Sequence, residues 1–390
     1  MRHKQRGLTV IELMVGLTIG LLASVAIVQV FGRSESYRRS SQGAADAQQA
    51  GTLASWRLMR DLRMAGAGLQ HGPTLWGCQL NLWRDGSVLL PRTSAWPAPF
   101  TAFPTALRLA PLAVVDGGGT NPDAIVVMSA RGSTGPAPMP TSIVTSTELN
   151  AMTTVAFNKG DVLLVTDMST VGPCQIGQVA NTYATVAGQP APKVIPTGAP
   201  GTAYNAPAGF TSLAAGRDYA LFNMGGLPSI ALYGVTNNSL VQYDVLENGG
   251  IAVPTVQAEN VENMQVLYGV DDGNGGTAND NVIDRWVVPG TAGFDAATMM
   301  SGGMGALQVK AIRIGLVVRS SEPSQRVGPT EVVVFPDLPA PLQVRIPLTA
   351  AQQPYARQVY DFVIPLRNQW IALCAEERRV NGVPAPGSCG

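Results

Sequence analysis

The hydrophobic pattern of the chain begins with one long apolar run. From Leu8 to Phe31 a single side chain is charged, that of Glu12. A helix of about 20 apolar residues is long enough to cross a bilayer. The apolar region of a cleaved secretory signal is shorter, about 7–15 residues. The pattern therefore predicts a membrane-spanning helix, with a simple signal anchor and a secretory signal as alternatives.

The helical pattern continues beyond the apolar run. No proline occurs between Arg33 and Met64. Small and apolar residues recur there every three or four positions, as on one face of a helix: Ala44, Ala47, Gly51, Ala54, Leu58, Leu62 and Ala65. We predict one helix from Leu8 to about Ala65, roughly 85 Å long at 1.5 Å per residue. Arg57, Arg60 and Arg63 lie off that face and indicate a solvated surface, or a contact with DNA or an acidic neighbour.

After the Gly-rich segment 66–77 the pattern changes to the short alternation of β-strands. The residues around Asn237-Asn238 predict a hairpin over Ile230–Val245. Gly72–Pro140 and Gly188–Gly209 are rich in Pro and Gly and predict ordered surface loops. The sequence of residues 80–225 as a whole does not predict a particular fold. The strands that we predict are Ala124–Met128, Val162–Thr166, Ile230–Tyr233, Val261–Val270, Val309–Arg319, Glu331–Phe335 and Val359–Ile364.

These patterns together predict an α+β fold. A long N-terminal helical spine, transmembrane in its first half, precedes a large antiparallel β-rich head with long loops. We expect a transmembrane helix over residues 8–32, the other half of the spine over 33–70, and the head over 71–390. Arg2, Lys4 and Arg6 precede the apolar run, which places the N-terminus in the cytoplasm and the head outside by the positive-inside rule.

Composition supports an extracytoplasmic head. The 26 basic and 26 acidic residues balance, so no nucleic-acid partner is expected. Only 13% of residues are charged, while Gly (43) and Pro (29) are frequent. The four cysteines, Cys78, Cys174, Cys374 and Cys389, all follow the apolar run. An even count in an oxidising compartment indicates two disulfides. Three connectivities are possible; proximity favours Cys374–Cys389, and elimination then gives Cys78–Cys174.

The N-terminal junction reads G-L-T-V-I-E-L-M-V from Gly7, and it resembles the processing site of type IV prepilins. The resemblance implies that residues 1–7 are a leader and that prepilin peptidase cuts between Gly7 and Leu8. It implies N-methylation of Leu8 and a docking role for Glu12, whose carboxylate would meet the N-terminal amine of a neighbouring subunit. Leu at the first mature position departs from the more usual Phe.

Four further segments resemble the PilW branch of minor pilins. They are V-E-N-M-Q-V-L-Y-G-V-D at Val261–Asp271, the polar loop that follows it with Trp286, the strand Val309–Ser320, and P-L-R-N at Pro365–Asn368. This resemblance implies a minor pilin of the inner membrane that later enters a surface pilus. Expected partners are the lipid bilayer, prepilin peptidase, other minor pilins, the major pilin, the inner-membrane assembly platform and a tip adhesin.

The implied function is to initiate or assemble a type IV pilus, in a tip priming complex, and so to support twitching motility or cell adhesion. Two alternatives remain open. One is a J-type minor pseudopilin of type II secretion, since the same leader serves both systems. The other is a filament-borne adhesin or DNA-uptake module.

Catalytic and metal chemistry have little support in the sequence. The leader apart, the chain has one histidine, His71, and no nucleophile, zinc or phosphate-loop motif, so we expect no enzyme. The loop from Asp271 to Asn281 is rich in oxygen ligands, but Gly276 and Ile283 occupy positions where an EF-hand needs ligands. We expect no cofactor. A looser calcium site is a weak alternative, with Asp271, Asp272, Asn274 and Asp280 as its candidate ligands.

Overall fold

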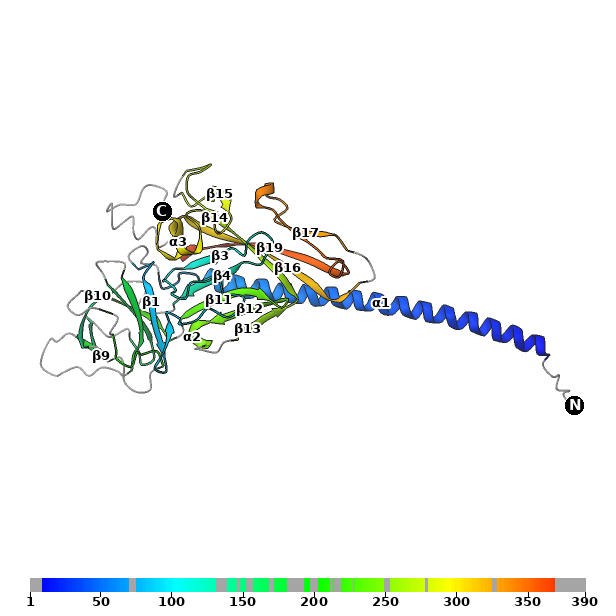
Figure 1. The fold of residues 1–390 in the computed structure, drawn as a ribbon, viewed down its shortest axis with the longest axis horizontal. Helices are drawn as coiled ribbons and strands as arrows, with labels where there is room; N and C mark the ends of the chain where they lie inside the picture. The colour runs from blue at the N-terminus through cyan, green and yellow to red at the C-terminus, as the bar shows by residue number, and fades with distance from the viewer. Residues whose placement is uncertain are drawn as a thin grey trace.

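A single long helix organises the molecule. The computed structural model describes residues 9–69, 75–130, 139–145, 148–151, 157–167, 172–180, 193–196, 203–210, 213, 219–226, 228–248, 253–277, 280–324 and 328–368. Helix α1 (Val10–Arg63) has 54 residues, about 80 Å at 1.5 Å per residue. Its N-terminal part projects from the molecule, and its C-terminal part lies along the strands (Figure 1). The predicted spine helix is therefore confirmed over the residues described.

An eight-stranded sheet, the distal sheet, lies at the end of the molecule away from the N-terminus of α1 (Figure 1). Its only parallel pair is β1–β8, and its other pairs are antiparallel. In spatial order its strands are β2 (Ser87–Leu90), β1 (Gln79–Arg84), β8 (Pro173–Gln178), β7 (Val162–Asp167), β10 (Tyr219–Gly225), β5 (Met139–Thr145), β6 (Glu148–Ala151) and β9 (Lys193–Pro196).

A five-stranded sheet, the middle sheet, is antiparallel throughout. Asn237 and Asn238 turn the β11–β12 hairpin with φ of 49° and 54°, which a two-residue turn of this kind requires. The predicted hairpin is confirmed. The strands, in spatial order, are β13 (Thr255–Glu259), β12 (Ser239–Asp244), β11 (Ser229–Thr236), β4 (Ala124–Ser129) and β3 (Leu112–Val115).

A four-stranded antiparallel sheet, the spine sheet, packs along α1. Its order is β15 (Arg285–Val287), β14 (Val261–Val270), β16 (Val309–Pro323) and β19 (Tyr355–Pro365). Side chains of β16 alternate between two cores: Leu316 joins the main core with α1, and Val317 joins a second core. The hairpin of β17 (Glu331–Val334) and β18 (Val344–Pro347) covers that second core.

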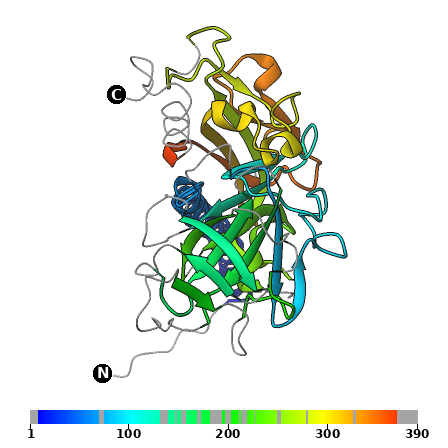
Figure 2. The ribbon, with the colours of Figure 1, turned by 90° about the vertical axis from the view of Figure 1, so that its left-hand side faces the viewer.

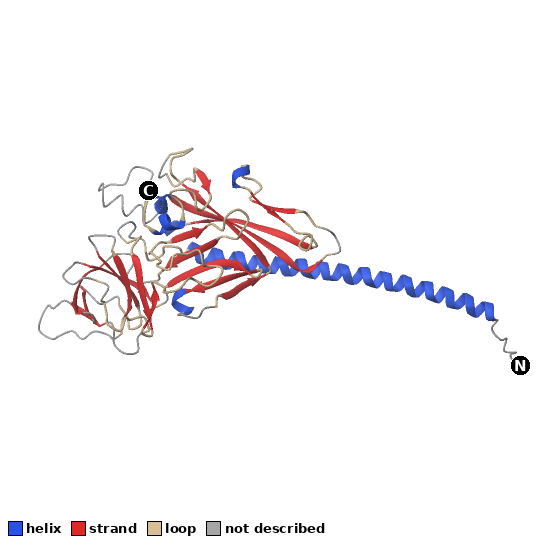
Figure 3. Cartoon of the chain, viewed as in Figure 1, coloured by secondary structure: helices blue, strands red, loops and turns tan. Residues whose placement is uncertain are grey.

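Short helices complete the described chain. They are α2 (Val245–Asn248), α3 (Ala296–Met300), α4 (Met304–Gln308) and a 3-10 helix, Ala340–Leu342. Figure 3 shows that strands dominate the head and that α1 dominates the helical part. Seen along the long axis, α1 lies at one side of the head, with the strands beside and below it (Figure 2). The α+β prediction is confirmed.

Two sequence-based expectations need correction. Segment Gly72–Pro140 holds β1, β2 and β3 besides the predicted β4, and Leu112 to Val114 in β3 are fully buried. Segment Gly188–Gly209 holds β9. These strands are short runs between Pro and Gly residues, and their order comes from pairing with strands far along the chain. The head is also not purely antiparallel, because β1 and β8 run parallel.

Candidate functional site: the apolar helix and its seam with the head

The N-terminal part of α1 exposes apolar side chains on every face. Val10–Phe31 has a mean hydropathy of 2.3, and none of it is buried. Within the described residues this is the one helix long and apolar enough to cross a membrane. An apolar surface of this extent needs lipid or other helices around it. The geometry therefore fits both a membrane span and the core of a helical filament.

The first turn of α1 carries the residue predicted to dock. Thr9 caps the helix, and its hydroxyl accepts from the N–H of Glu12 at 3.4 Å. Glu12 is exposed within the first turn, where the helix dipole favours a carboxylate. Gly7 and Leu8 lie outside the described residues. Cleavage, methylation and the docking role of Glu12 therefore stay predictions.

The two hydroxyl groups in the apolar segment are satisfied within the helix itself. The hydroxyl of Thr18 donates to the carbonyl of Val15 at 2.9 Å, and that of Ser24 donates to Gly20 at 2.8 Å. In lipid such internal bonds remove the cost of unpaired hydroxyls. A Cβ placed at Gly16 or Gly20 would meet nothing within 4 Å, so both glycines leave an open, small-residue surface.

The C-terminal half of α1 forms a seam with the head. The predicted face is confirmed from Ala47 onward, where Ala47, Gly51, Ala54, Leu58, Leu62 and Ala65 are buried. The prediction was wrong at Ala44, which is exposed, because the neighbouring Gly43 faces the head there instead. Polar contacts hold the seam at both ends. The hydroxyl of Ser321 donates to Asp46 at 2.9 Å, and the amide of Asn368 donates to the carbonyl of Ala65 at 3.0 Å. The seam fixes the direction in which the apolar helix leaves the head.

The predicted arginine stripe is largely used inside the molecule. Arg57 donates to Gln257 of β13, and Arg60 contacts Asp61 at 2.6 Å. The hydroxyl of Tyr233 also donates to Asp61. Burial and this carboxylate raise the pKa of Tyr233 above its ordinary range, so Tyr233 stays a neutral donor. Arg63 is exposed, as a solvated surface predicts.

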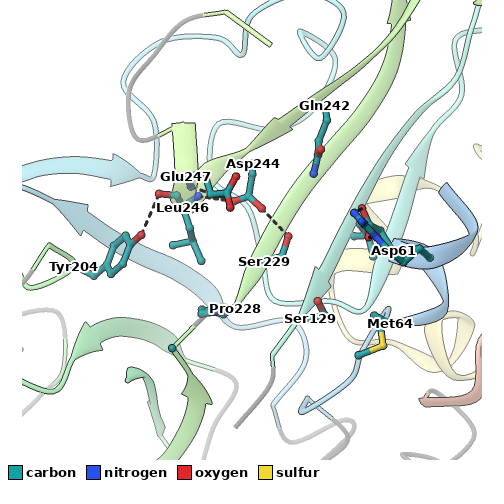
Figure 4. Close-up of a pocket in the computed structure, with 13 residues that line it drawn as sticks. Asp61, Met64, Ser129, Tyr204, Pro228, Ser229, Gln242, Asp244, Leu246 and Glu247 are labelled. Atoms are coloured by element: carbon teal, nitrogen blue, oxygen red, sulfur yellow. Dashed lines mark hydrogen bonds and ion pairs between the residues drawn. The ribbon is translucent and has the colours of Figure 1, made fainter. Parts of the chain in front are cut away.

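A cavity of about 310 Å³ lies where α1, the middle sheet and Tyr204 meet (Figure 4). Its most buried acid, Asp244, accepts from the hydroxyl of Ser229 at 2.7 Å and from the N–H of Leu246 at 2.9 Å. Burial raises the pKa of Asp244. These bonds hold the start of α2, so Asp244 has a structural role that explains its position.

The Cys78–Cys174 disulfide is present, with the two Cα atoms 5.5 Å apart. It joins residue 78, just before β1, to β8, beside their parallel pairing. The sequence favoured this pair among three connectivities, and the structure confirms it. Cys374 and Cys389 lie outside the described residues, as does His71, so the second disulfide stays a prediction.

The acidic residues of loop 271–281 are held by contacts within the chain. Asp272 pairs with Arg285 at 2.6 Å, and this hydrogen bond lowers the pKa of Asp272. Asp271 accepts from the N–H of Asn281 at 2.8 Å, and Asp280 accepts from that of Val282 at 2.9 Å. The described residues contain no group of three or more His, Cys, Asp or Glu that could hold a metal ion. The calcium alternative stays a prediction.

Two segments of the chain match known protein families. Residues 2–28 match the family model described as the prokaryotic N-terminal methylation motif. Residues 230–368, from β11 to the end of the described chain, match the model described as type IV pilus-assembly protein W, PilW. The chain combines a prepilin-type N-terminus with a PilW-family segment. The PilW match covers 139 of the 390 residues, so the likeness to this pilus-assembly family belongs to the segment that begins in β11.

No curated protein matches the chain. Among solved structures, a type IV-like pilin from Thermus thermophilus is similar at 13% identity with a TM-score of 0.22. The alignment covers 54% of this chain and 86% of that pilin. The PilW-family segment holds the spine sheet and three strands of the middle sheet, whereas the distal sheet lies outside the matched residues.

Sequence reasoning missed the partners of two residues in the seam. Gly51 lies against Tyr360 of β19, and Asp61 against Tyr233 of β11. Gly51 stood on the predicted helix face, but its partner is 309 positions away along the chain. A lone aspartate among Arg57, Arg60 and Arg63 is the sequence signal that could have identified Asp61.

Proposed function

We propose that this protein is a minor pilin that helps to initiate and assemble a type IV pilus. Prepilin peptidase cuts between Gly7 and Leu8, Leu8 is methylated, and the protein waits in the inner membrane with its head in the periplasm. The observation that carries the proposal is the geometry of α1. One continuous helix exposes an apolar half and fixes its other half to the head.

Assembly follows from packing in this proposal. The apolar half of α1 leaves lipid and enters a bundle of the same kind of helices, contributed by other minor pilins and the major pilin. The Glu12 carboxylate pairs there with the N-terminal amine of a neighbouring subunit. A buried charge is costly alone, whereas a charge pair offsets part of the desolvation of both groups. Position in a tip priming complex, and through it twitching motility or attachment, completes the proposed role.

A second candidate function is a binding module carried by the filament. The distal sheet favours it, because this sheet lies outside the PilW-family segment and at the end opposite the apolar helix (Figure 1). In a subunit at a filament tip, that end would face outward. The matched family is a pilus-assembly protein, which favours a pilus over a type II pseudopilus.

The first experiment is N-terminal mass mapping of the full chain from membranes and from sheared surface filaments. A peptide that begins at methylated Leu8 is expected in both fractions. A chain that begins at Met1, or that is cut beyond Ala23, would overturn the prepilin mechanism. A correctly processed chain found in membranes but never in surface filaments would favour the pseudopilus.

A further inference from the structure

The spine sheet ends in a long strand whose second edge has no strand beside it in the described chain. β19 pairs with β16 along one edge only. It has 11 residues. The other edge strands of the three larger sheets, β2, β9, β13, β3 and β15, have only 3 to 5 residues. Short edge strands limit pairing with other chains, so β19 is the edge most open to it.

The direction of the backbone groups of β19 follows from two bonds. The N–H of Leu366 donates to the carbonyl of Lys310 at 2.8 Å, and the N–H of Ala356 donates to Ser320 Oγ at 3.1 Å. The backbone N–H and C=O groups of even-numbered residues therefore point toward β16. Residues of an antiparallel strand alternate in this respect. The register is continuous from Arg357 to Pro365, so Val359, Asp361 and Val363 present N–H and C=O groups to the open edge.

The open edge is protected at its end, where the nitrogen of Pro365 faces outward, and by the charge of Asp361. From Arg357 to Ile364 it has neither proline nor lysine, and its pairing with β16 there has no bulge. Val363 is 45% exposed, and Phe362 and Tyr360 are half-buried. A strand added at this edge would cover these apolar side chains on both faces. β-Branched and aromatic residues pair well across strands.

An uncharged groove on α1 adjoins the same edge. It has a volume of about 560 Å³ and is lined by Ala45, Gln48, Gln49, Thr52, Leu53 and Trp56. The Tyr360 hydroxyl of β19 donates to the Gln48 carbonyl at 3.2 Å, which places the groove beside the strand. Trp56 is 55% exposed and lies about 37 Å along the helix from Phe31, beyond the reach of a lipid headgroup layer. The groove therefore fits a protein neighbour.

Charges along the edge specify the neighbour further. Near one end, Glu262 contacts both Arg357 (2.6 Å) and Arg319 (3.9 Å), which leaves an excess of positive charge. Nearer the other end, Arg313 contacts both Asp337 and Asp361, which leaves an excess of negative charge. The first group is covered, because the Arg357 side chain is 3% exposed and contacts Glu262 on the far side of β16. A matching segment therefore carries a basic residue opposite the second group.

A second copy of this chain does not fit in the symmetric antiparallel arrangement. β19 runs in the same direction as α1, because Tyr360 lies beside Gln48 and Asn368 beside Ala65. A two-fold pair of antiparallel β19 strands would turn the two apolar helices in opposite directions. Both helices could not then enter one membrane or one filament core.

We infer that the open edge of β19 accepts an extended segment of a different filament subunit as an added strand. The segment is apolar and β-branched beside Val363 and basic beside Asp361. Main-chain hydrogen bonds to Val359, Asp361 and Val363 give the affinity, and the side chains give the choice of partner. The inference rests on the proposed function, because it takes the partner from the same filament.

The test compares Val363→Pro with Val363→Ala in the full chain in cells. Proline removes one outward N–H and leaves the bonds to β16, whereas alanine removes only the side-chain bulk. The amount of each variant in sheared filaments is measured relative to its amount in membranes. We expect Val363→Pro to be depleted roughly five- to tenfold relative to Val363→Ala, as the loss of one hydrogen bond implies. Equal incorporation would overturn the inference.

A second measurement does not depend on the folding of the proline variant. A photo-crosslinking amino acid replaces Val363 in an otherwise unchanged chain, and the crosslinked peptide is identified by mass. A crosslink to a strand-forming segment of another filament subunit supports the inference. A crosslink to a second copy, to lipid only or to nothing overturns it. If the unmodified chain is absent from filaments, the proposed function itself fails, which separates the two results.

Discussion

At the scale of single residues, Gly51 marks the closest approach between α1 and the spine sheet. A Cβ at this position would overlap the ring of Tyr360. The ring has little room to move, because its hydroxyl contacts both the Gln48 carbonyl and the Gln358 side chain. Glycine is therefore required here for packing, although it weakens the helix locally.

Replacing Gly51 by alanine should consequently destabilise the head instead of strengthening the helix. We expect a loss of about 1–3 kcal/mol in the free energy of unfolding, the usual range for overpacking. Thermal or denaturant unfolding of the detergent-solubilised chain measures it. Gln49→Ala, at an exposed position of the same helix, serves as a control and should change stability by less than about 0.5 kcal/mol. Tyr360→Ala should suppress the effect of Gly51→Ala, and simple additivity of the two would contradict this account.

A second residue links stability to pH. Asp123 is buried and accepts from the N–H groups of Gly117 at 2.9 Å and Val266 at 2.7 Å. Burial raises the pKa of Asp123 to about 7. Between pH 4 and 7 the folded chain therefore holds a proton that the unfolded chain has released. Its contribution makes the free energy of unfolding fall as pH rises through this window, by at most about 4 kcal/mol.

Asp123→Asn should remove most of this slope, because an amide stays neutral at every pH in the window. Urea unfolding of the two proteins at pH 4, 5.5 and 7 measures the difference. Burial also raises the pKa of Asp244. The Asp123→Asn protein should therefore keep a smaller slope of the same sign, which Asp244 contributes. Parallel pH profiles for the two proteins would show that Asp123 does not titrate in this range.

At the scale of elements, the Cys78–Cys174 disulfide ties two strands that are 96 positions apart in the chain. Closing a loop of this length is worth about 4–5 kcal/mol in the chain-entropy model. Cys78→Ser with Cys174→Ser should therefore lower the melting temperature of the full chain by several degrees. The matched pair Cys374→Ser with Cys389→Ser tests the other predicted disulfide separately. An unchanged melting temperature in the first variant would deny its bond a stabilising role.

At the scale of the whole molecule, one continuous helix connects the exposed apolar N-terminal segment to the head. Glu12→Val makes the exposed apolar half of α1 uncharged, so insertion and cleavage should continue. Filament incorporation should fall at least about tenfold, because the neighbouring amine would lose its partner in a dry helical bundle. Quantification of the chain in membranes and in sheared filaments measures both effects. Glu12→Asp is the charge-retaining control, and normal incorporation of Glu12→Val would remove the docking role from Glu12.

Local periodicity in the sequence was enough to predict the long helix, its buried face and its apolar half. Each strand predicted in this way is present in the structure. The Asn237-Asn238 turn could also be predicted from the sequence, because two residues with positive φ define it. These features depend on residues that are close in the chain. The N-terminal processing motif is likewise a contiguous sequence pattern. The sequence alone therefore suffices to propose roles for Gly7, Leu8 and Glu12.

Only the tertiary structure decided features that join distant residues. It set the order of the distal sheet, the parallel β1–β8 pair and the burial of Leu112–Val114. It also selected one pairing for Cys78 and set Asp61 against Tyr233. The physical reason is common to these cases. Short strands and single polar groups are stabilised by the neighbours that folding brings to them, and the local sequence does not specify those neighbours.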